Sequence, residues 1–240
     1  MMHVMGRLMG SKARRVTATD FDGSNDFAER GGDLTGVADG KEGSLVFWVS
    51  PDGDGAEYTL YEHQSSKVLV RRDTSNRLDL ILRNAASTII VRRITTNTIL
   101  AAGGFQPIFM SWDLANTTVN IYFGDTAATL NTSTPTTDDT IDYTAGDVAV
   151  AARASTNTDK LNGCLSRLWF DDSYIDFSEE ANRRLFMYAD ESPKYLGSNG
   201  QFPTGSQPAV YFPNGDPAVN RGRGGAFTVS GSPSVCAERP

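Results

Sequence analysis

Short apolar segments separated by turn-forming residues recur along the chain. Residues 43–50 form an unbroken apolar run between polar turns, which is typical of a strand buried on both faces. Residues 77–84 alternate instead, with a leucine at every second position, so one face of this strand is predicted to be buried. The leucines are Leu78, Leu80 and Leu82, and the residues of the opposite face are Arg77, Asp79, Ile81 and Arg83.

Twelve segments of this kind predict strands. They are residues 16–21, 43–50, 57–64, 68–73, 77–84, 88–94, 107–114, 119–123, 147–152, 161–171, 209–213 and 226–230. The Thr- and Asp-rich residues 131–140 are predicted to form an exposed loop. Many short strands favour an all-β fold, a two-sheet antiparallel jelly-roll sandwich rather than the alternative, an up-and-down barrel. The first and last strands should be neighbours, because their backbone groups otherwise have no partner.

One short surface helix is predicted at residues 178–188. Ser178 is a suitable N-cap, acidic residues fill the first turn and arginines follow, in the order that the helix dipole favours. Ala181, Leu185 and Tyr188 fall on one face at helical spacing.

The composition fits a compact domain with a basic arm. Of the 240 residues, 39% are hydrophobic and 21% charged, too apolar for a disordered chain and too polar for a membrane protein. The net charge of −7 argues against a general nucleic-acid binder. Residues 1–15 hold four basic residues and no acidic one, at Arg7, Lys12, Arg14 and Arg15. We therefore expect an arm at 1–15, without the apolar stretch of a secretory signal, and a single domain at 16–240.

The cysteines, histidines and acidic turns give little sign of a chemical site. Cys164 and Cys236 are far apart in the sequence and are predicted to be unpaired thiols, because nothing in the sequence brings their Cα atoms within disulfide reach. His3 and His63 are too few for a histidine-based metal site.

The Asp-Gly-Asp-Gly turn at 52–55 offers oxygens to calcium but lacks EF-hand spacing, so an ordinary turn without a metal is favoured.

Several motifs, taken in order, resemble a known superfamily. They are Phe-Asp-Gly-Ser-Asn-Asp-Phe at 21–27, Leu-Val-Phe-Trp-Val at 45–49, Ser-Trp-Asp at 111–113, Val-Asn-Ile-Tyr-Phe at 119–123 and Leu-Asn-Gly-Cys-Leu-Ser-Arg-Leu-Trp-Phe at 161–170. The chain thereby resembles laminin-G-like domains of the concanavalin A-like lectin/glucanase superfamily. Segments 176–184, 203–205 and 223–229 are similar to a subgroup encoded by tailed phages and prophages. The resemblance implies a jelly roll with adjacent terminal strands in a virion or cell-surface setting.

The residues argue against an enzyme. Hydrolases of the resembled superfamily carry a strand with three alternating acids, whereas Glu57 and Glu62 fall on opposite faces of one predicted strand. The tryptophans lie within apolar strands and are predicted core residues. They are Trp48, Trp112 and Trp169. The tyrosines Tyr61, Tyr122 and Tyr174 are the better candidates for sugar stacking on the surface.

One stretch reverses the acidic balance of the chain. Residues 67–93 contain seven basic and two acidic residues. The candidate ligand- or partner-binding residues within it are Arg77, Asp79, Arg83 and Arg92. We expect Arg77 and Arg83 to face solvent on one strand. The strip would dock on an acidic partner or on an anionic cell-envelope glycan; the alternative is a solvated strand face with cross-strand Arg–Asp pairs.

The sequence thus predicts a non-enzymatic surface protein of a phage virion, either a capsid decoration or a tail or fibre component. Its lectin-like domain would adhere weakly to host-surface glycans, strengthened by many copies on one particle. The alternatives are a purely structural virion protein without a ligand and, third, a glycan hydrolase. Expected partners are other virion proteins, against which the arm would become ordered, a host glycan and further copies of the chain; nucleic acid and membrane are not expected. The expected location is the virion exterior.

Overall fold

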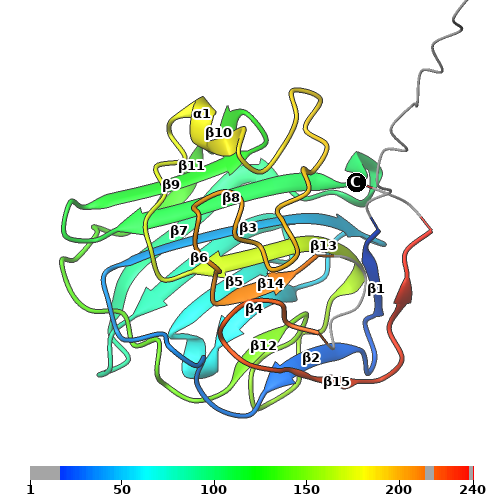
Figure 1. Ribbon diagram of the computed structural model, residues 1–240, viewed down its shortest axis with the longest axis horizontal. Helices are drawn as coiled ribbons and strands as arrows, with labels where there is room; N and C mark the ends of the chain where they lie inside the picture. The colour runs from blue at the N-terminus through cyan, green and yellow to red at the C-terminus, as the bar shows by residue number, and fades with distance from the viewer. Residues whose placement is uncertain (1–16, 214–218, 238–239) are drawn as a thin grey trace, which may run out of the picture.

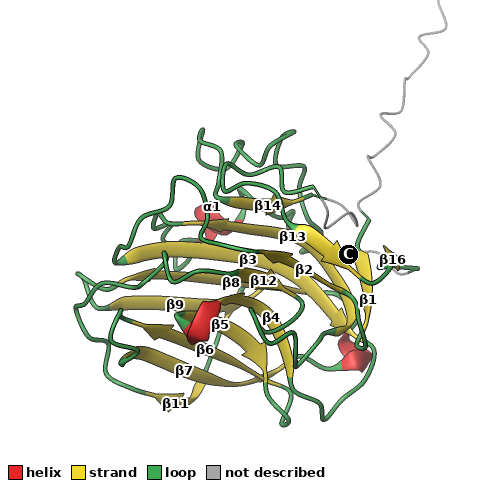
Figure 2. Cartoon of the chain, turned by 90° about the horizontal axis from the view of Figure 1, so that it is seen from below, coloured by secondary structure: helices red, strands yellow, loops and turns green. Residues whose placement is uncertain are grey.

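The computed structural model describes residues 17–213, 219–237 and 240, and strands dominate this part of the chain (Figure 1, Figure 2). The strands are β1 (Thr19–Asp22), β2 (Phe27–Arg30), β3 (Glu42–Pro51), β4 (Tyr58–His63), β5 (Val68–Arg72), β6 (Arg77–Arg83), β7 (Ile89–Thr98), β8 (Gln106–Asp113), β9 (Thr118–Phe123), β10 (Thr126–Ala127), β11 (Leu130–Ser133), β12 (Val148–Val150), β13 (Asn162–Asp171), β14 (Val210–Phe212), β15 (Thr228–Ser230) and β16 (Ser234–Val235). The short helical elements are η1 (Gln64–Ser66), η2 (Ala101–Gly103) and α1 (Glu180–Arg183). The arm residues Arg7, Lys12, Arg14 and Arg15 lie outside the described ranges.

The strands form two antiparallel sheets stacked face to face. Sheet A has the order β10-β9-β8-β3-β13-β1-β16, with β14 also paired to β13. Sheet B has the order β11-β7-β6-β5-β4-β12-β2-β15. The strands of both sheets pair in the antiparallel sense, as between β3 and β8 and between β5 and β6. This architecture confirms the predicted two-sheet jelly-roll sandwich.

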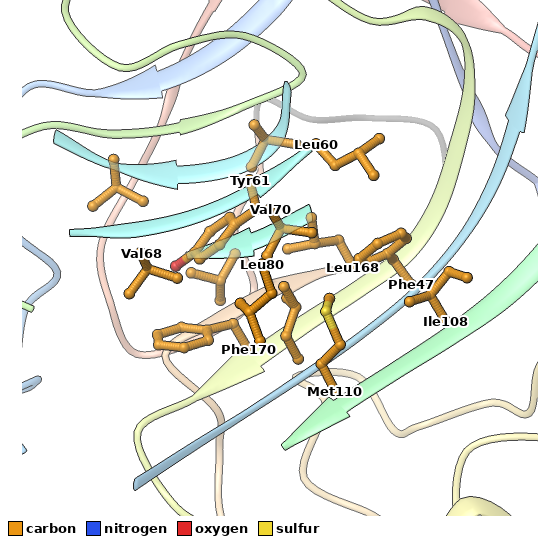
Figure 3. Close-up of a cluster of buried hydrophobic side chains, with 14 of the residues drawn as sticks. Phe47, Leu60, Tyr61, Val68, Val70, Leu80, Ile108, Met110, Leu168 and Phe170 are labelled. Atoms are coloured by element: carbon orange, nitrogen blue, oxygen red, sulfur yellow. The ribbon is translucent and has the colours of Figure 1, made fainter. Parts of the chain in front are cut away.

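The main core fills the space between the sheets. Figure 3 shows Phe47 and Met110 of sheet A meeting Val70 and Leu80 of sheet B. The three leucines of β6 are all fully buried, which confirms the predicted core face of this strand, although Asp79 and Ile81 of the opposite face are buried as well. Full burial of a leucine side chain stabilises a fold by about 1.5–3 kcal/mol, so a slip of one residue in β6 would be strongly unfavourable.

A second apolar cluster covers the outer face of sheet A. Trp48 and Trp169 point away from the main core and pack against Phe186 and Leu196, which come from the segment after β13. This cover explains why β3 is buried on both faces, as its unbroken apolar run predicts. All three tryptophans are buried, which confirms their predicted place in the core.

A short helix does lie within the predicted range 178–188, but it is shorter than expected and the predicted apolar face does not pack on the sandwich. Only α1, residues Glu180–Arg183, is helical, and the Ser178 hydroxyl donates to Asp176 Oδ1 at 2.6 Å instead of capping it. The chain then turns back, so that the Lys194 amide donates to the Phe186 carbonyl at 2.7 Å and the Tyr188 amide to the Ser192 carbonyl at 2.9 Å. These backbone bonds replace helical ones. The predicted apolar face is therefore exposed, at Ala181, Leu185 and Tyr188.

The chain ends meet, although not through the predicted pair of strands. β1 pairs with β16, where Thr19 lies opposite Val235, and the predicted last strand, β15, pairs with β2. Figure 1 shows the red β15 beside the blue β2. β2 was not expected from the sequence, because its four residues carry no long alternation. Part of the predicted loop at 131–140 is also a strand, since β11 pairs with β7.

The two cysteines form a disulfide, which corrects the prediction of free thiols. The Cα atoms of Cys164 and Cys236 are 6.0 Å apart, within the usual range for such a bond. The topology brings them together: β1 pairs with β13 on one side and with β16 on the other, and the Cys236 amide donates to the Ala18 carbonyl at 3.0 Å. Sequence spacing alone carries no trace of this arrangement.

No helix within the described ranges is long and apolar enough to cross a membrane.

Candidate functional site

The predicted basic strip lies on the outer face of sheet B, and its centre is a buried carboxylate. Asp79 of β6 is inaccessible to solvent. Arg71 of β5 donates to its Oδ2 from Nε at 3.1 Å and from Nη2 at 2.9 Å. Arg92 of β7 donates from Nε to Oδ1 at 3.2 Å and from Nη2 to Oδ2 at 3.0 Å. Three adjacent strands therefore contribute one Arg–Asp–Arg row.

The row continues to a second acidic residue, Glu57, which directly precedes β4. Arg71 Nη1 donates to Glu57 Oε1 at 2.7 Å. Burial lowers the pKa of Arg71, but its bonds to Asp79 and Glu57 outweigh burial and raise that pKa above the usual value. We call Glu57, Arg71, Asp79 and Arg92 the polar row. Its side chains are fixed by mutual ion pairs, and its formal charges cancel.

The other two predicted site residues are not part of the polar row. Arg77 Nη2 pairs with Asp73 Oδ2 at 2.7 Å, and its Nη1 donates to Asn131 Oδ1 at 3.0 Å. Arg83 Nη1 donates to the Ser87 carbonyl at 2.8 Å. Both arginines are only partly exposed, so the prediction that they face solvent holds in part.

Arg71 and Glu57 were missed at the sequence level, although the signal for Arg71 was present. The register of β5 and β6 is symmetric about Ser75, which places Arg71 opposite Asp79. A hairpin whose turn fills the gap between the predicted strands 68–73 and 77–84 has this register. Arg71 and Arg92 of the strip are thus held in cross-strand pairs with Asp79, the arrangement described by the alternative interpretation.

The tyrosines predicted to stack sugars are not free platforms. Tyr61 is fully buried, and its hydroxyl lies 2.9 Å from His63 Nε2, so its predicted exposure is wrong. The Tyr122 ring lies under the Arg183 guanidinium at 4.3 Å. The Tyr174 hydroxyl accepts from Asn120 Nδ2 at 3.1 Å, and burial together with Asp176 raises the pKa of Tyr174 to about 12.

The acidic turns are occupied by bonds within the chain. Asp54 Oδ1 accepts from the Ala101 amide at 3.0 Å. In a separate hollow of about 310 Å³ lined by acidic residues, Asp22 Oδ1 accepts from the Ser24 amide at 2.8 Å, and such backbone bonds lower the pKa of Asp22. Across residues 17–213 and 219–237, no three carboxylate, imidazole or thiolate groups are grouped so that they could hold a metal ion.

Comparison with known proteins gives a likeness of fold. No protein-family model and no curated protein matches the sequence. Among solved structures, a candidate carbohydrate-binding protein from Bacteroides ovatus ATCC 8483 is 10% identical, with 92% of this chain and 60% of that chain covered and a TM-score of 0.64. The native heptameric SAP-like pentraxin from Limulus polyphemus is 13% identical, with 67% and 78% covered and a TM-score of 0.50.

A third match is the full extracellular region of zebrafish Gpr126/Adgrg6. It is 12% identical, with 92% of this chain and 26% of that chain covered and a TM-score of 0.52. The chain spans 60% of the length of the Bacteroides ovatus protein. At these identities the matches show a shared two-sheet jelly-roll fold and nothing about ligands.

Proposed function

We propose that this chain is a non-catalytic glycan-binding protein displayed on the exterior of a phage particle. The observation that carries the proposal is the polar row on sheet B. Asp79 accepts from Nε and Nη2 of Arg92, while Nη1 of Arg92 has no partner among the described residues. The Arg92 side chain is 33% exposed, so this donor is within reach of a ligand.

A fixed row of donors and acceptors suits a polyhydroxylated ligand. Sugar hydroxyls both donate and accept hydrogen bonds, and the row offers guanidinium hydrogens beside carboxylate oxygens. Because ion pairs already hold these side chains, a ligand would order few rotamers on binding. The cancelled charges favour recognition of hydroxyls over recognition of an anionic group, which refines the expected anionic glycan.

The fold likeness to a candidate carbohydrate-binding protein supports this proposal. The motifs at 176–184, 203–205 and 223–229 support the phage setting, as either a capsid decoration or a tail component. Many copies on one particle would convert weak binding into useful avidity. Hydrolysis has less support, because Glu57 pairs with Arg71 whereas Glu62 pairs with Arg153, and two such carboxylates do not flank one bond.

Charge-removing variants on sheet B test the proposal. The full chain, displayed in many copies on beads, is applied to a glycan array as the wild type, as Arg92→Gln and as Arg83→Gln. We expect Arg92→Gln to weaken binding roughly tenfold or more, because it removes a charged donor. Arg83→Gln is the matched control, since the Arg83 side chain donates to the Ser87 backbone carbonyl and lies outside the polar row.

Two outcomes would change the assignment. A wild type that binds no glycan but binds another virion protein tightly would support the purely structural alternative. Immunogold electron microscopy of particles tests the location, and label confined to free protein would overturn display on the virion.

A further inference from the structure

The exposed aromatic side chains gather in one segment. Tyr188, Tyr195 and Phe202 are the aromatic residues among the large exposed hydrophobic side chains of the described chain. All three come from the segment between β13 and β14, which covers the outer face of sheet A, on the side of the sandwich away from sheet B. Tyr195 is 39% exposed and Phe202 is 62% exposed.

Tyr195 and Phe202 form a corner of two rings. Their centroids are 5.7 Å apart and their planes meet at 85°. The turn between them is anchored, because the Phe202 amide donates to the Leu196 carbonyl at 3.0 Å and Trp169 Nε1 donates to the Gly200 carbonyl at 2.9 Å. The corner is therefore tied to a buried strand residue of sheet A.

Two glycines allow this turn to lie close to the rings. Gly197 has a φ of +92°, and a Cβ there would come within 2.9 Å of Phe202 Cδ1. Gly200 has a φ of +82°, and a Cβ there would come within 2.9 Å of the Tyr211 ring. Both positions favour glycine for their backbone and for their contacts. The outward position of Phe202 is thus set by the backbone.

Polar groups beneath the turn lack partners. Asn199 Oδ1 has no hydrogen-bond partner in the described chain, and neither has Nε of Arg167, a buried residue of β13. Arg167 Nη1 donates to the Tyr211 hydroxyl at 2.9 Å, and the ring of the same tyrosine lies against Gly200.

We infer that the Tyr195–Phe202 corner is a second sugar-binding surface, specific for neutral pyranose rings with equatorial substituents. Such a ring presents axial C–H groups on its faces, so one face can stack on one aromatic ring of the corner while its edge contacts the other. Lys194, which precedes Tyr195 in the sequence, lies over the Tyr188 ring at 5.4 Å rather than in the corner. The negative faces of aromatic rings favour the C–H groups of a neutral sugar over the carboxylate of an acidic one. The inference rests on the proposed glycan binding and adds a ligand class and a surface to it.

Titration of the full chain with cellotetraose and chitotetraose, followed by calorimetry, tests this inference. Phe202→Ala and Tyr195→Ala should each weaken binding roughly threefold to tenfold, the range expected for one aromatic contact. Phe202→Trp should keep it. Val235→Ala is the control, because Val235 is 63% exposed on β16 and lies outside this cover.

The outcomes separate this inference from the proposed function. If the wild type binds sugars and Arg92→Gln weakens binding while the aromatic variants do not, the corner is not a sugar site and the proposed function stands. If the aromatic variants alone weaken binding, the corner stands and the polar row does not. If they only reduce incorporation into particles, the corner docks a protein and the inference is overturned. A wild type that binds no sugar overturns both.

Discussion

Removing the disulfide should destabilise the sandwich substantially without abolishing its fold. The bond between Cys164 and Cys236 closes a loop of 72 residues. In the chain-entropy description, a loop of this length restricts the unfolded state by about 4 kcal/mol at 25 °C. For a domain of this size, that loss lowers the melting temperature by roughly 8–16 °C.

The contacts around Cys236 indicate where the loss appears first. β16 pairs with β1 at only two positions, and its residues are exposed. Apart from the disulfide, two hydrogen bonds hold this segment. The Cys236 amide donates to the Ala18 carbonyl at 3.0 Å, and the Ser232 amide donates to Asp26 Oδ1 at 2.7 Å. We therefore expect β16 to open locally, with new protease cleavage after Gly231, at denaturant concentrations where the sheets remain intact.

Urea unfolding of four samples measures the effect. These are the oxidised wild type, the reduced wild type, Cys236→Ser and the double variant Cys164→Ser/Cys236→Ser. The last three samples lack the same disulfide, so their free energies of unfolding should agree within about 1 kcal/mol. The reasoning would be refuted if the free energy of unfolding fell by less than about 1 kcal/mol in all three, relative to the oxidised wild type. It would also be refuted if the double variant lost twice as much of this free energy as the single variant.

The remaining predictions concern the buried histidine and the arm. Burial lowers the pKa of His63 to about 4, against an ordinary 6.5, so the unfolded chain binds the proton more readily and the free energy of unfolding should fall by about 3 kcal/mol between pH 6.5 and pH 4. His63→Gln should lose this slope in pH-dependent urea unfolding, and an unchanged slope would assign it to other groups. Deletion of residues 2–15 should leave the melting temperature unchanged and prevent assembly onto the particle, as measured by incorporation; full incorporation would place the docking surface on the sandwich.

Much of the fold could be predicted from local patterns. The leucine alternation of β6 indicated the face that packs in the main core, and the short gap between the predicted strands 68–73 and 77–84 fits the observed β5–β6 hairpin, because a hairpin register follows from its turn. The disulfide could not be predicted, since it depends on β1 lying between two strands that are far apart in the sequence. The helix prediction failed for a related reason: capping signals at 178–184 are local, whereas the fold-back from 186 to 194 is fixed by packing on sheet A.

The polar row shows that the charge counted along residues 67–93 differs from the charge that neighbouring strands bring together on the outer face of sheet B. Residues 67–93 carry a surplus of five positive charges, yet Lys67 pairs with Asp142 at 3.0 Å and Arg71 with Glu57 at 2.7 Å, and both acids lie outside that stretch. Arg92 is likewise paired, with the buried Asp79. A sheet gathers its charges from neighbouring strands, so the relevant count runs across strands rather than along one segment.

The two interpretations of the outer face of sheet B, a basic strip and a neutralised row, predict different salt dependences of glycan binding. A basic strip docked on an anionic glycan should lose affinity steeply with salt, because exposed charges are screened over about 8–10 Å at physiological ionic strength. A neutralised row that binds hydroxyls should lose little. We expect glycan binding by the wild type to change less than about threefold between 50 and 500 mM NaCl, measured on the same displayed chain used for Arg92→Gln. A tenfold or larger loss of glycan affinity over this range would support an anionic ligand and contradict the proposed neutral one.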